Sequence, residues 1–158
     1  MTSVEEDVPS GLIIRALRAD DLQRIVRMDE QVRGRRRQLW YEGKLRLALE
    51  ESDLHLSLGA EVDGTLVGVV LVSVRYGEFG QPEPMAILDT ILVDPAFARR
   101  GVASKLLSQL MDHLHALRVL TLRTEVGWKE TDMIGFFSDA DFLPAARLVL
   151  ERPVHAPE

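Results

Sequence analysis

A run of fifteen residues in the middle of the chain, VDPAFARRGVASKLL (93–107), joins a strand end and a proline to two arginines, a glycine and a leucine-rich helix. The first turn of an α-helix has backbone N–H groups without intrahelical acceptors and carries the positive end of the helix dipole. Gly101 and the small residues after it leave that turn bare, and Arg99 and Arg100 can add charge-assisted contacts. The spacing therefore predicts a site for a phosphate-bearing ligand, in particular a diphosphate.

Two carboxylates could accept a proton near this turn. Asp89 interrupts the apolar run MAILDTILV, where aspartate has an unfavourable β-propensity, and Glu125 lies near the end of the run TLRTEV. Each has a plainer alternative: Asp89 could be a carboxylate satisfied by a neighbouring strand or loop, and Glu125 a solvated surface residue. The sequence favours Asp89 as the general base, with Glu125 second.

A basic run, RGRRR (33–37), is followed by Trp40, Tyr41 and Lys44. Arginines bind phosphate and aromatic rings stack on bases, so a nucleic-acid surface is one interpretation. A solvated helix is the other, and the net charge of −6 argues against nucleic acid and an acidic membrane as partners.

Length and composition predict one globular domain. The chain has 158 residues, 46% of them hydrophobic, and no cysteine, which excludes disulfides and thiolate chemistry. No zinc motif is present, no apolar run reaches membrane-spanning length, and the N-terminus lacks an apolar signal core. We therefore expect a cytoplasmic protein without a metal, with a flexible N-terminus at 1–10, one domain over 11–154 and a tail at 155–158.

Hydrophobic periodicity predicts an α/β (α+β) fold with a mixed central sheet of about six strands flanked by helices. One face of the run at 85–93 should carry Ile87, Asp89, Ile91 and Val93, and the other Leu88, Thr90 and Leu92. The expected elements are, in chain order, a strand from Leu12, a helix after Asp20, two helical pieces over 32–52 with breaks at Gly34 and Gly43, two strands over 54–76 joined at Asp63-Gly64, a strand over 85–93, a helix after Gly101, a strand from Val119, a helix over 131–142 and a closing strand over 146–154.

These residues resemble the GCN5-related N-acetyltransferase (GNAT) superfamily, in particular its bacterial members. The segment ARRGVA (98–103) is similar to the family signature Gln/Arg-x-x-Gly-x-Gly/Ala, and LVDPAF before it is a typical lead-in. FFSDADF (136–142) looks like the family helix that commonly ends Leu-Tyr-x-x-x-Gly-Phe. The resemblance covers about 12–154.

The resemblance implies transfer of an acetyl group from acetyl-CoA to a primary amine in a ternary complex, with a small molecule or a protein as acceptor and with a homodimer as a common assembly. It implies that Val93 supplies an oxyanion donor and that the first two helices, with Arg35, Arg36 and Trp40, border the acceptor, for which a carboxylate-bearing molecule is one hypothesis. Trp128, just before the last helix, could line the acyl or acceptor pocket, although packing is the more frequent use of such an aromatic residue. The coenzyme residues that it implies are Ile91, Leu92, Val93, Ala98, Arg99, Arg100, Gly101, Val102, Ala103, Ser104, Glu130, Phe136 and Phe137.

The chain departs from the family pattern at several positions. Ala98 replaces a Gln or Arg, Phe137 stands where a tyrosine is common, Asp141 replaces a glycine, and Glu130 is closest to a frequent asparagine. The missing tyrosine leaves a second function open: a non-catalytic acyl-CoA-binding or regulatory module that binds a partner through the basic helical segment.

Overall fold

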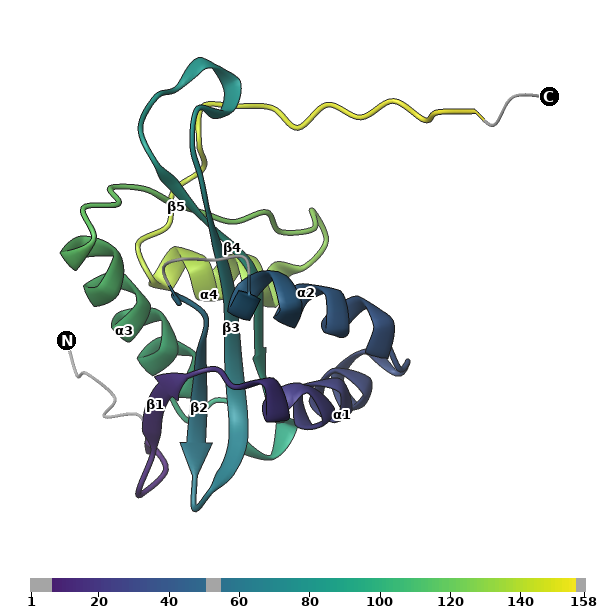
Figure 1. Ribbon diagram of the computed structural model, residues 1–158, viewed down its shortest axis with the longest axis vertical. Helices are drawn as coiled ribbons and strands as arrows, with labels where there is room; N and C mark the ends of the chain where they lie inside the picture. The colour runs from purple at the N-terminus through teal and green to yellow at the C-terminus, as the bar shows by residue number, and fades with distance from the viewer. Residues whose placement is uncertain (1–6, 51–54, 156–158) are drawn as a thin grey trace. The chain divides into compact units, whose positions relative to one another are not determined.

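The computed structural model describes residues 7–50 and 55–155, which form two compact units, Met1–Glu125 and Val126–Glu158. The first unit contains a five-stranded sheet in the order β1-β2-β3-β4-β5 (Figure 1). Four neighbouring strands pair antiparallel and β5 joins β4 in parallel, so the predicted mixed α/β fold is confirmed, with five strands rather than about six. The strands are β1 (Ile13–Ala16), β2 (Leu58–Val62), β3 (Thr65–Arg75), β4 (Met85–Val93) and β5 (Leu122–Arg123).

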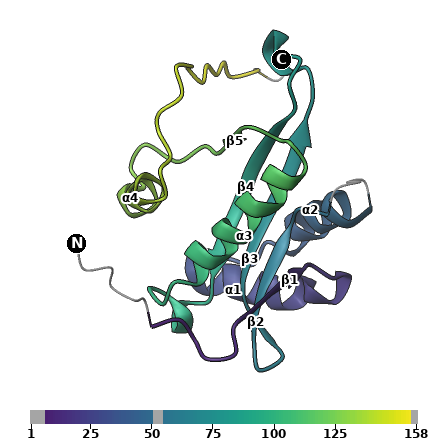
Figure 2. The ribbon, with the colours of Figure 1, turned by 90° about the vertical axis from the view of Figure 1, so that its left-hand side faces the viewer.

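Helices cover both faces of this sheet. α1 (Leu22–Arg33) and α2 (Gln38–Glu50) lie on one face and α3 (Val102–Ala116) on the other (Figure 2). The α1–α2 face buries one apolar cluster that includes Ile25 and Tyr41 from the helices and Val69 and Leu92 from the strands. None of the helices within 7–50 and 55–155 is long and apolar enough to cross a membrane.

The central strand β3 is buried on both faces, as its run of valines and leucines requires. The turn that joins it to β2 has positive φ at Asp63 (48°) and Gly64 (77°), which is the hairpin geometry that this dipeptide predicts. Gly68 allows α3 to pack closely on β3, since a Cβ at this position would lie 2.9 Å from Val102 Cγ1. The start of α3 is therefore fixed directly against the middle of the sheet.

β4 contains a bulge at Asp89. Leu71 of β3 pairs with Thr90 and the next residue, Val72, pairs with Leu88, so Asp89 has no partner in the register. Asp89 contacts Lys44 of α2, and Leu92 belongs to the cluster under α1 and α2, so the two side chains lie on one face. The expected strict alternation of side chains along β4 is therefore wrong, because the extra residue shifts the residues after it to the opposite face from the one expected.

The helical segment after β1 breaks only once. Gly34, with φ of 75°, ends α1, whereas Gly43 lies inside a continuous α2 and the expected second break is wrong. At the start of α1, a 3₁₀ turn (Ala19–Asp21) precedes the helix, and Asp21 rather than Asp20 accepts the Arg18 N–H at 2.8 Å. The end of the segment, 51–54, lies outside the described residues.

The second unit contains α4 (Thr131–Asp139), which confirms the predicted short helix. Its C-terminus is a Schellman motif: Phe142 N–H donates to Phe137 O at 2.9 Å, and Asp141 adopts a left-handed φ of 64°. The expected closing strand over 146–154 is not formed, and Leu148 and Leu150 there are exposed. A strand needs a hydrogen-bonded neighbour, and none pairs with this segment in the described chain.

Candidate functional site

The turn between β4 and α3 presents a run of free backbone amides. The first helical bond of α3 is from Lys105 N–H to Gly101 O (3.0 Å), and in the described chain no acceptor faces the N–H groups of 99–104. Arg99 (φ 59°) and Gly101 (φ 75°) both have left-handed backbone, a conformation that occurs in turns whose successive N–H groups bind anions in other proteins. The residues predicted for phosphate binding therefore span the loop before α3 and its first turn, in which Arg99 and Ser104 are exposed and Gly101 and Val102 are buried.

Side chains around this turn differ in their availability. Arg99 and Ser104 are exposed, Ala98 is exposed with an extended backbone, and the side chain of Val102 is buried against β3. Arg100 donates to the Asp7 carbonyl at 3.3 Å and lies 5.7 Å from the centre of the Phe97 ring. Arg99 is thus the more available of the two arginines for a ligand.

Asp94 holds the turn in place. Its Oδ1 accepts the Ala96 N–H at 2.9 Å, which caps the 3₁₀ turn η3 (Pro95–Phe97), and its other oxygen pairs with Arg24 of α1. Arg24 also donates to the Leu66 carbonyl at 2.9 Å. One arginine of α1 therefore connects β3 to the loop that leads into the amide run.

The edge of β4 next to this loop is open. Asp94 N–H donates to Val67 O at 2.8 Å. Along an antiparallel ladder, the N–H and C=O groups of successive residues point alternately toward and away from the partner strand. Ile91 and Val93 therefore direct their N–H and C=O groups away from β3. β5 pairs only with Ala86 and Ile87, after which Thr124 Oγ1 donates to Leu88 O at 2.9 Å. In the described chain no strand covers the edge at Ile91 and Val93.

Leu92 does not reach this open edge. Its backbone faces β3 and its side chain is buried in the cluster under α1 and α2. Among the three predicted residues at the end of β4, Ile91 and Val93 are therefore the two whose backbone groups can contact a ligand.

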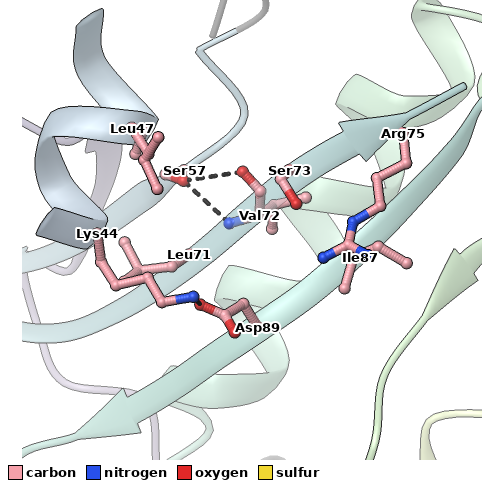
Figure 3. Close-up of a pocket in the computed structure, with 10 residues that line it drawn as sticks. Lys44, Leu47, Ser57, Leu71, Val72, Ser73, Arg75, Ile87 and Asp89 are labelled. Carbon is pink, nitrogen blue, oxygen red and sulfur yellow. Dashed lines mark hydrogen bonds and ion pairs between the residues drawn. The ribbon is translucent and has the colours of Figure 1, made fainter. Parts of the chain in front are cut away.

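Two adjoining hollows flank β4, and Asp89 lines both. The helix-side hollow, about 160 Å³, lies between α2 and strands β3 and β4 and includes Lys44, Leu47, Ser73 and Asp89 (Figure 3). Lys44 Nζ lies 2.7 Å from Asp89 Oδ2, and both side chains are about one-third exposed. The plainer expectation is a carboxylate satisfied by a neighbouring strand or loop, whereas the observed partner of Asp89 is a lysine of the helix α2.

The edge hollow, about 340 Å³, lies on the side of β5 and contains Glu125 with Asp89, Arg75 and Arg123. The two carboxylates considered as bases from the sequence are thus brought to one hollow. Arg75 and Ile87 line both hollows as well. No ion pair within the described residues involves Arg75, Arg123 or Glu125.

A buried aspartate forms hydrogen bonds near the start of α2, the helix whose later residues line the helix-side hollow. Asp29 of α1 is fully buried and accepts two hydrogen bonds from Arg37, at 2.8 and 2.7 Å, and one from Tyr41 Oη at 2.9 Å. Burial alone would raise the pKa of Asp29, but these bonds outweigh it and lower the pKa below its ordinary value. Burial and the bond to Asp29 raise the pKa of Tyr41, so its phenol stays protonated near neutral pH.

The remaining predicted acceptor residues of this unit do not line either hollow. Arg35 is exposed, and Arg36 donates to Gln23 and Gln38 and lies 3.7 Å from Glu30. Trp40 lies between two cations, with Arg37 4.5 Å and Lys44 Nζ 5.3 Å from its ring centre. The basic run is thus largely engaged with Asp29, Glu30 and Trp40.

Comparison with known proteins bears on this arrangement of open edge and amide turn. A family model described as "Acetyltransferase (GNAT) family" matches residues 19–142, most of the chain. The chain belongs to the GNAT acetyltransferase family. No curated protein sequence matches it significantly.

Solved structures share the GNAT fold at low identity. The aminoglycoside N-acetyltransferase AAC(6')-Iy in complex with CoA has a TM-score of 0.74 and 20% identity, covering 92% of this chain and 98% of that one. A ribosomal-protein-alanine N-acetyltransferase from Brucella melitensis has a TM-score of 0.71 and 20% identity, covering 89% and 98%. A transcriptional regulator from Bacillus halodurans has a TM-score of 0.75 and 16% identity, covering 90% and 99%.

The second unit holds the other GNAT positions. Glu130 precedes α4 and accepts the Gly127 N–H at 2.7 Å, Trp128 is 94% exposed, and Phe137 is buried and packs on Phe136 and Phe142. Asp141 occupies the left-handed position where the GNAT pattern commonly has glycine, which Asp tolerates better than most residues. The Phe137 ring thus serves packing in α4 and carries no exchangeable proton.

Sequence reasoning missed Lys44 and Arg75 as residues of the GNAT chain's hollows. Lys44 follows Tyr41 by three residues in α2, so a helical projection would have placed its side chain next to that of Tyr41. Arg75 ends β3 and pairs in the ladder with Met85 at the start of β4. Only the pairing register brings it beside Ile87 and Asp89, and no local pattern encodes that register.

Proposed function

We propose that this GNAT chain transfers an acetyl group from acetyl-CoA to a primary amine by direct attack in a ternary complex. The observation that carries the proposal is the continuity of the open edge at Ile91 and Val93 with the amide run 99–104. An extended chain of amides ending in a diphosphate has the complementary groups for both features. Acetyl-CoA is such a molecule.

The residues present fit this cosubstrate. The unbonded N–H groups of the turn and the exposed Arg99 are donors for the diphosphate, and the backbone of Ile91 and Val93 can pair with the pantetheine amides. Bound acetyl-CoA would supply an acetyl group activated as a thioester. The Val93 N–H is our candidate donor to the carbonyl oxygen as negative charge develops there.

The acceptor amine must lose a proton before it attacks, since the pKa of a lysine-like amine is about 10.4. Asp89 is the favoured acceptor of that proton and Glu125 the second candidate, directly or through water, and both line the edge hollow. The thiol that leaves has a pKa of about 8.5, so water can protonate it. The absence of a tyrosine at 137 is therefore compatible with turnover.

The non-catalytic alternative needs a free basic surface for a partner. Arg33 and Arg37 lie against Asp29, and Arg36 lies near Glu30, so much of that run is neutralised within the chain. This engagement disfavours the alternative and supports the enzyme.

Thermal melting with acetyl-CoA, followed by release of free thiol across an amine panel, tests the proposal. A ligand at one hundred times its Kd adds about 2.7 kcal/mol, so we expect Tm to rise by roughly 5–10 °C. Acetyl-pantetheine, which has the thioester but no diphosphate, is the matched control and should shift Tm far less. An unchanged Tm in millimolar acetyl-CoA would refute the cosubstrate, and binding without thiol release would refute the enzyme.

A further inference from the structure

The two hollows beside β4 carry charges of both signs. Their cations are Lys44, Arg75 and Arg123, and their carboxylates are Glu78, Asp89 and Glu125. Among the described residues, the 2.7 Å contact of Lys44 with Asp89 is the one ion pair that joins two of these six groups. A polycationic acceptor would be matched best by a surplus of carboxylates, whereas these hollows offer equal numbers of both signs.

Arg75 is the cation best placed to recognise an anionic group. It lines both hollows together with Asp89, and Figure 3 shows its side chain directed toward Ile87. No hydrogen bond or ion pair within 7–50 and 55–155 engages its guanidinium, unlike that of Arg15, Arg24 or Arg37. A guanidinium presents a planar set of donors that matches a carboxylate with two parallel hydrogen bonds.

We propose that the acceptor is a small amine that also carries a carboxylate, as a free amino acid does, and that Arg75 selects it by binding that carboxylate. This inference rests on the proposed function, because it names the acceptor of the same reaction. The ammonium end of such a molecule is complementary to Asp89 and Glu125, and the carboxylate end to Arg75. The edge hollow, about 340 Å³, lies at the small end of the range of about 300–1,000 Å³ typical of small-molecule pockets, and the helix-side hollow, about 160 Å³, lies below that range.

The reaction balances without any further reactant. The neutral amine nitrogen forms a bond to the thioester carbon, the carbon–sulfur bond breaks, and coenzyme A leaves as the thiolate. The ammonium loses one proton to the carboxylate base or water before the attack, and the nitrogen loses a second one after it has bonded to the carbon. Of these two protons, one is taken up by the thiolate through water and the other is released to solvent. The carboxylate of the acceptor takes no part in bond changes, so its contact with Arg75 should contribute to binding alone.

Matched acceptors test the inference. Thiol release is measured with L-amino acids, each paired with its carboxamide and with the amine that lacks the carboxylate. A carboxamide has an α-amine pKa of about 8, which leaves more neutral amine than the free amino acid has, so intrinsic reactivity would favour the carboxamide. We expect the best free amino acid to exceed its carboxamide by at least about ten-fold in kcat/KM.

The variants are Arg75→Gln, Arg75→Lys and, as a matched control on the exposed face of α2, Arg46→Gln, since Arg46 lines neither hollow. Arg75→Gln should raise KM for the amino acid about ten-fold with kcat nearly unchanged and remove the preference over the carboxamide. Arg75→Lys should recover part of it, and Arg46→Gln should resemble the wild type. The acetyl-CoA melting shift should be equal in all four proteins.

The outcomes separate the two proposals. Turnover of carboxamides or simple amines as fast as free amino acids, or a preference that survives Arg75→Gln, would overturn the role of Arg75 and leave the N-acetyltransferase standing. Thiol release with none of the amines would overturn both. A preference that disappears in Arg75→Gln, returns in part in Arg75→Lys and is unchanged in Arg46→Gln supports both.

Discussion

At the scale of single residues, Asp89 combines two properties that a proton acceptor needs. It is about one-third exposed in a hollow, and its carboxylate lies 2.7 Å from Lys44 Nζ, which fixes its position there. An incoming ammonium can take over the contact that Lys44 makes, because both are cations of similar size. The same carboxylate can thus be satisfied by the chain in the free protein and by the acceptor during turnover.

Replacing Asp89 by Asn should lower kcat/KM by about 100-fold or more, since a positioned general base typically contributes that much. Glu125→Gln should have a smaller effect, and Asp112→Asn on the exposed side of α3 serves as the control. Thiol-release kinetics over a range of pH measure this. Normal kcat/KM in both Asp89→Asn and Glu125→Gln would exclude both residues as the base.

At the scale of elements, the amide run depends on how closely α3 lies on the sheet. A Cβ at Gly68 would lie 2.9 Å from Val102 Cγ1 and 3.1 Å from Leu106 Cδ1. The first contact is closer than packed atoms allow and the second is tight, so these side chains or the first turn of α3 would have to shift. The geometry of the amide run therefore depends on the missing side chain at Gly68 on β3.

Gly68→Ala should destabilise the protein by about 1–3 kcal/mol and weaken acetyl-CoA binding, because it displaces the start of α3. Val102→Ala removes the nearest atom, so the double variant should lose less than the sum of the two single losses. Gly43→Ala is the control, since nothing lies within 4 Å of its Cβ position in α2, and it should stabilise by about 0.5–1 kcal/mol. Urea unfolding measures all four; additive losses would contradict the steric account.

Local patterns predicted the long elements well. The run 85–93, the hairpin at Asp63-Gly64 and the leucine spacing after Gly101 each match an observed element, because burial and turn chemistry act within a few residues. The strand expected from Val119 is reduced to Leu122–Arg123, since its pairing with β4 stops where the two diverge. Pairing is a property of two segments, and the expected closing strand failed for the same reason.

The candidate site likewise has one part that local sequence predicts and another that depends on pairing between distant segments. The spacing of Arg99, Arg100 and Gly101 predicts the amide run, whereas the role of the end of β4 follows only from the resemblance to the GNAT superfamily. The hollows are lined by residues of α2, β3, β4 and the segment after β5. Only the sheet register brings these residues together. Asp89 and Glu125 could be named from the sequence because they are carboxylates within or at the end of apolar runs. Arg75 has no such local signal, so only the register reveals it.

At the scale of the whole molecule, Asp29 joins α1 to the loop before α2 through a buried ion pair. Its carboxylate has no exposed surface and accepts bonds from Arg37 and Tyr41. A buried charge that loses its partner is strongly destabilising, so this cluster should stabilise the whole α1–α2 layer. It also holds the helix that carries Lys44.

Asp29→Asn should cost about 3 kcal/mol of unfolding free energy at neutral pH. Because the folded pKa of Asp29 lies below the ordinary value of about 3.9, its contribution is complete above that value and lost as pH falls through the folded pKa. The gap between wild type and Asp29→Asn should therefore be constant from pH 8 to about 5 and shrink below about pH 4. Tyr41→Phe, the control, should cost about 1 kcal/mol.

Chemical denaturation at a series of pH values measures that gap. A gap that widens in acid would contradict a lowered pKa for Asp29 and the ion pair that accounts for it.

The extra residue at position 89 interrupts β4 without changing the pairing on either side of it, because Leu88 and Thr90 already lie opposite the consecutive residues Val72 and Leu71. Deleting Asp89 would therefore leave an uninterrupted ladder in which Ile91 and Val93 keep their peptide groups directed away from β3. The shortened strand would lose the carboxylate that contacts Lys44 and keep its open edge. A chain one residue shorter could thus have a more regular sheet and still bind the proposed cosubstrate, yet lack the favoured base.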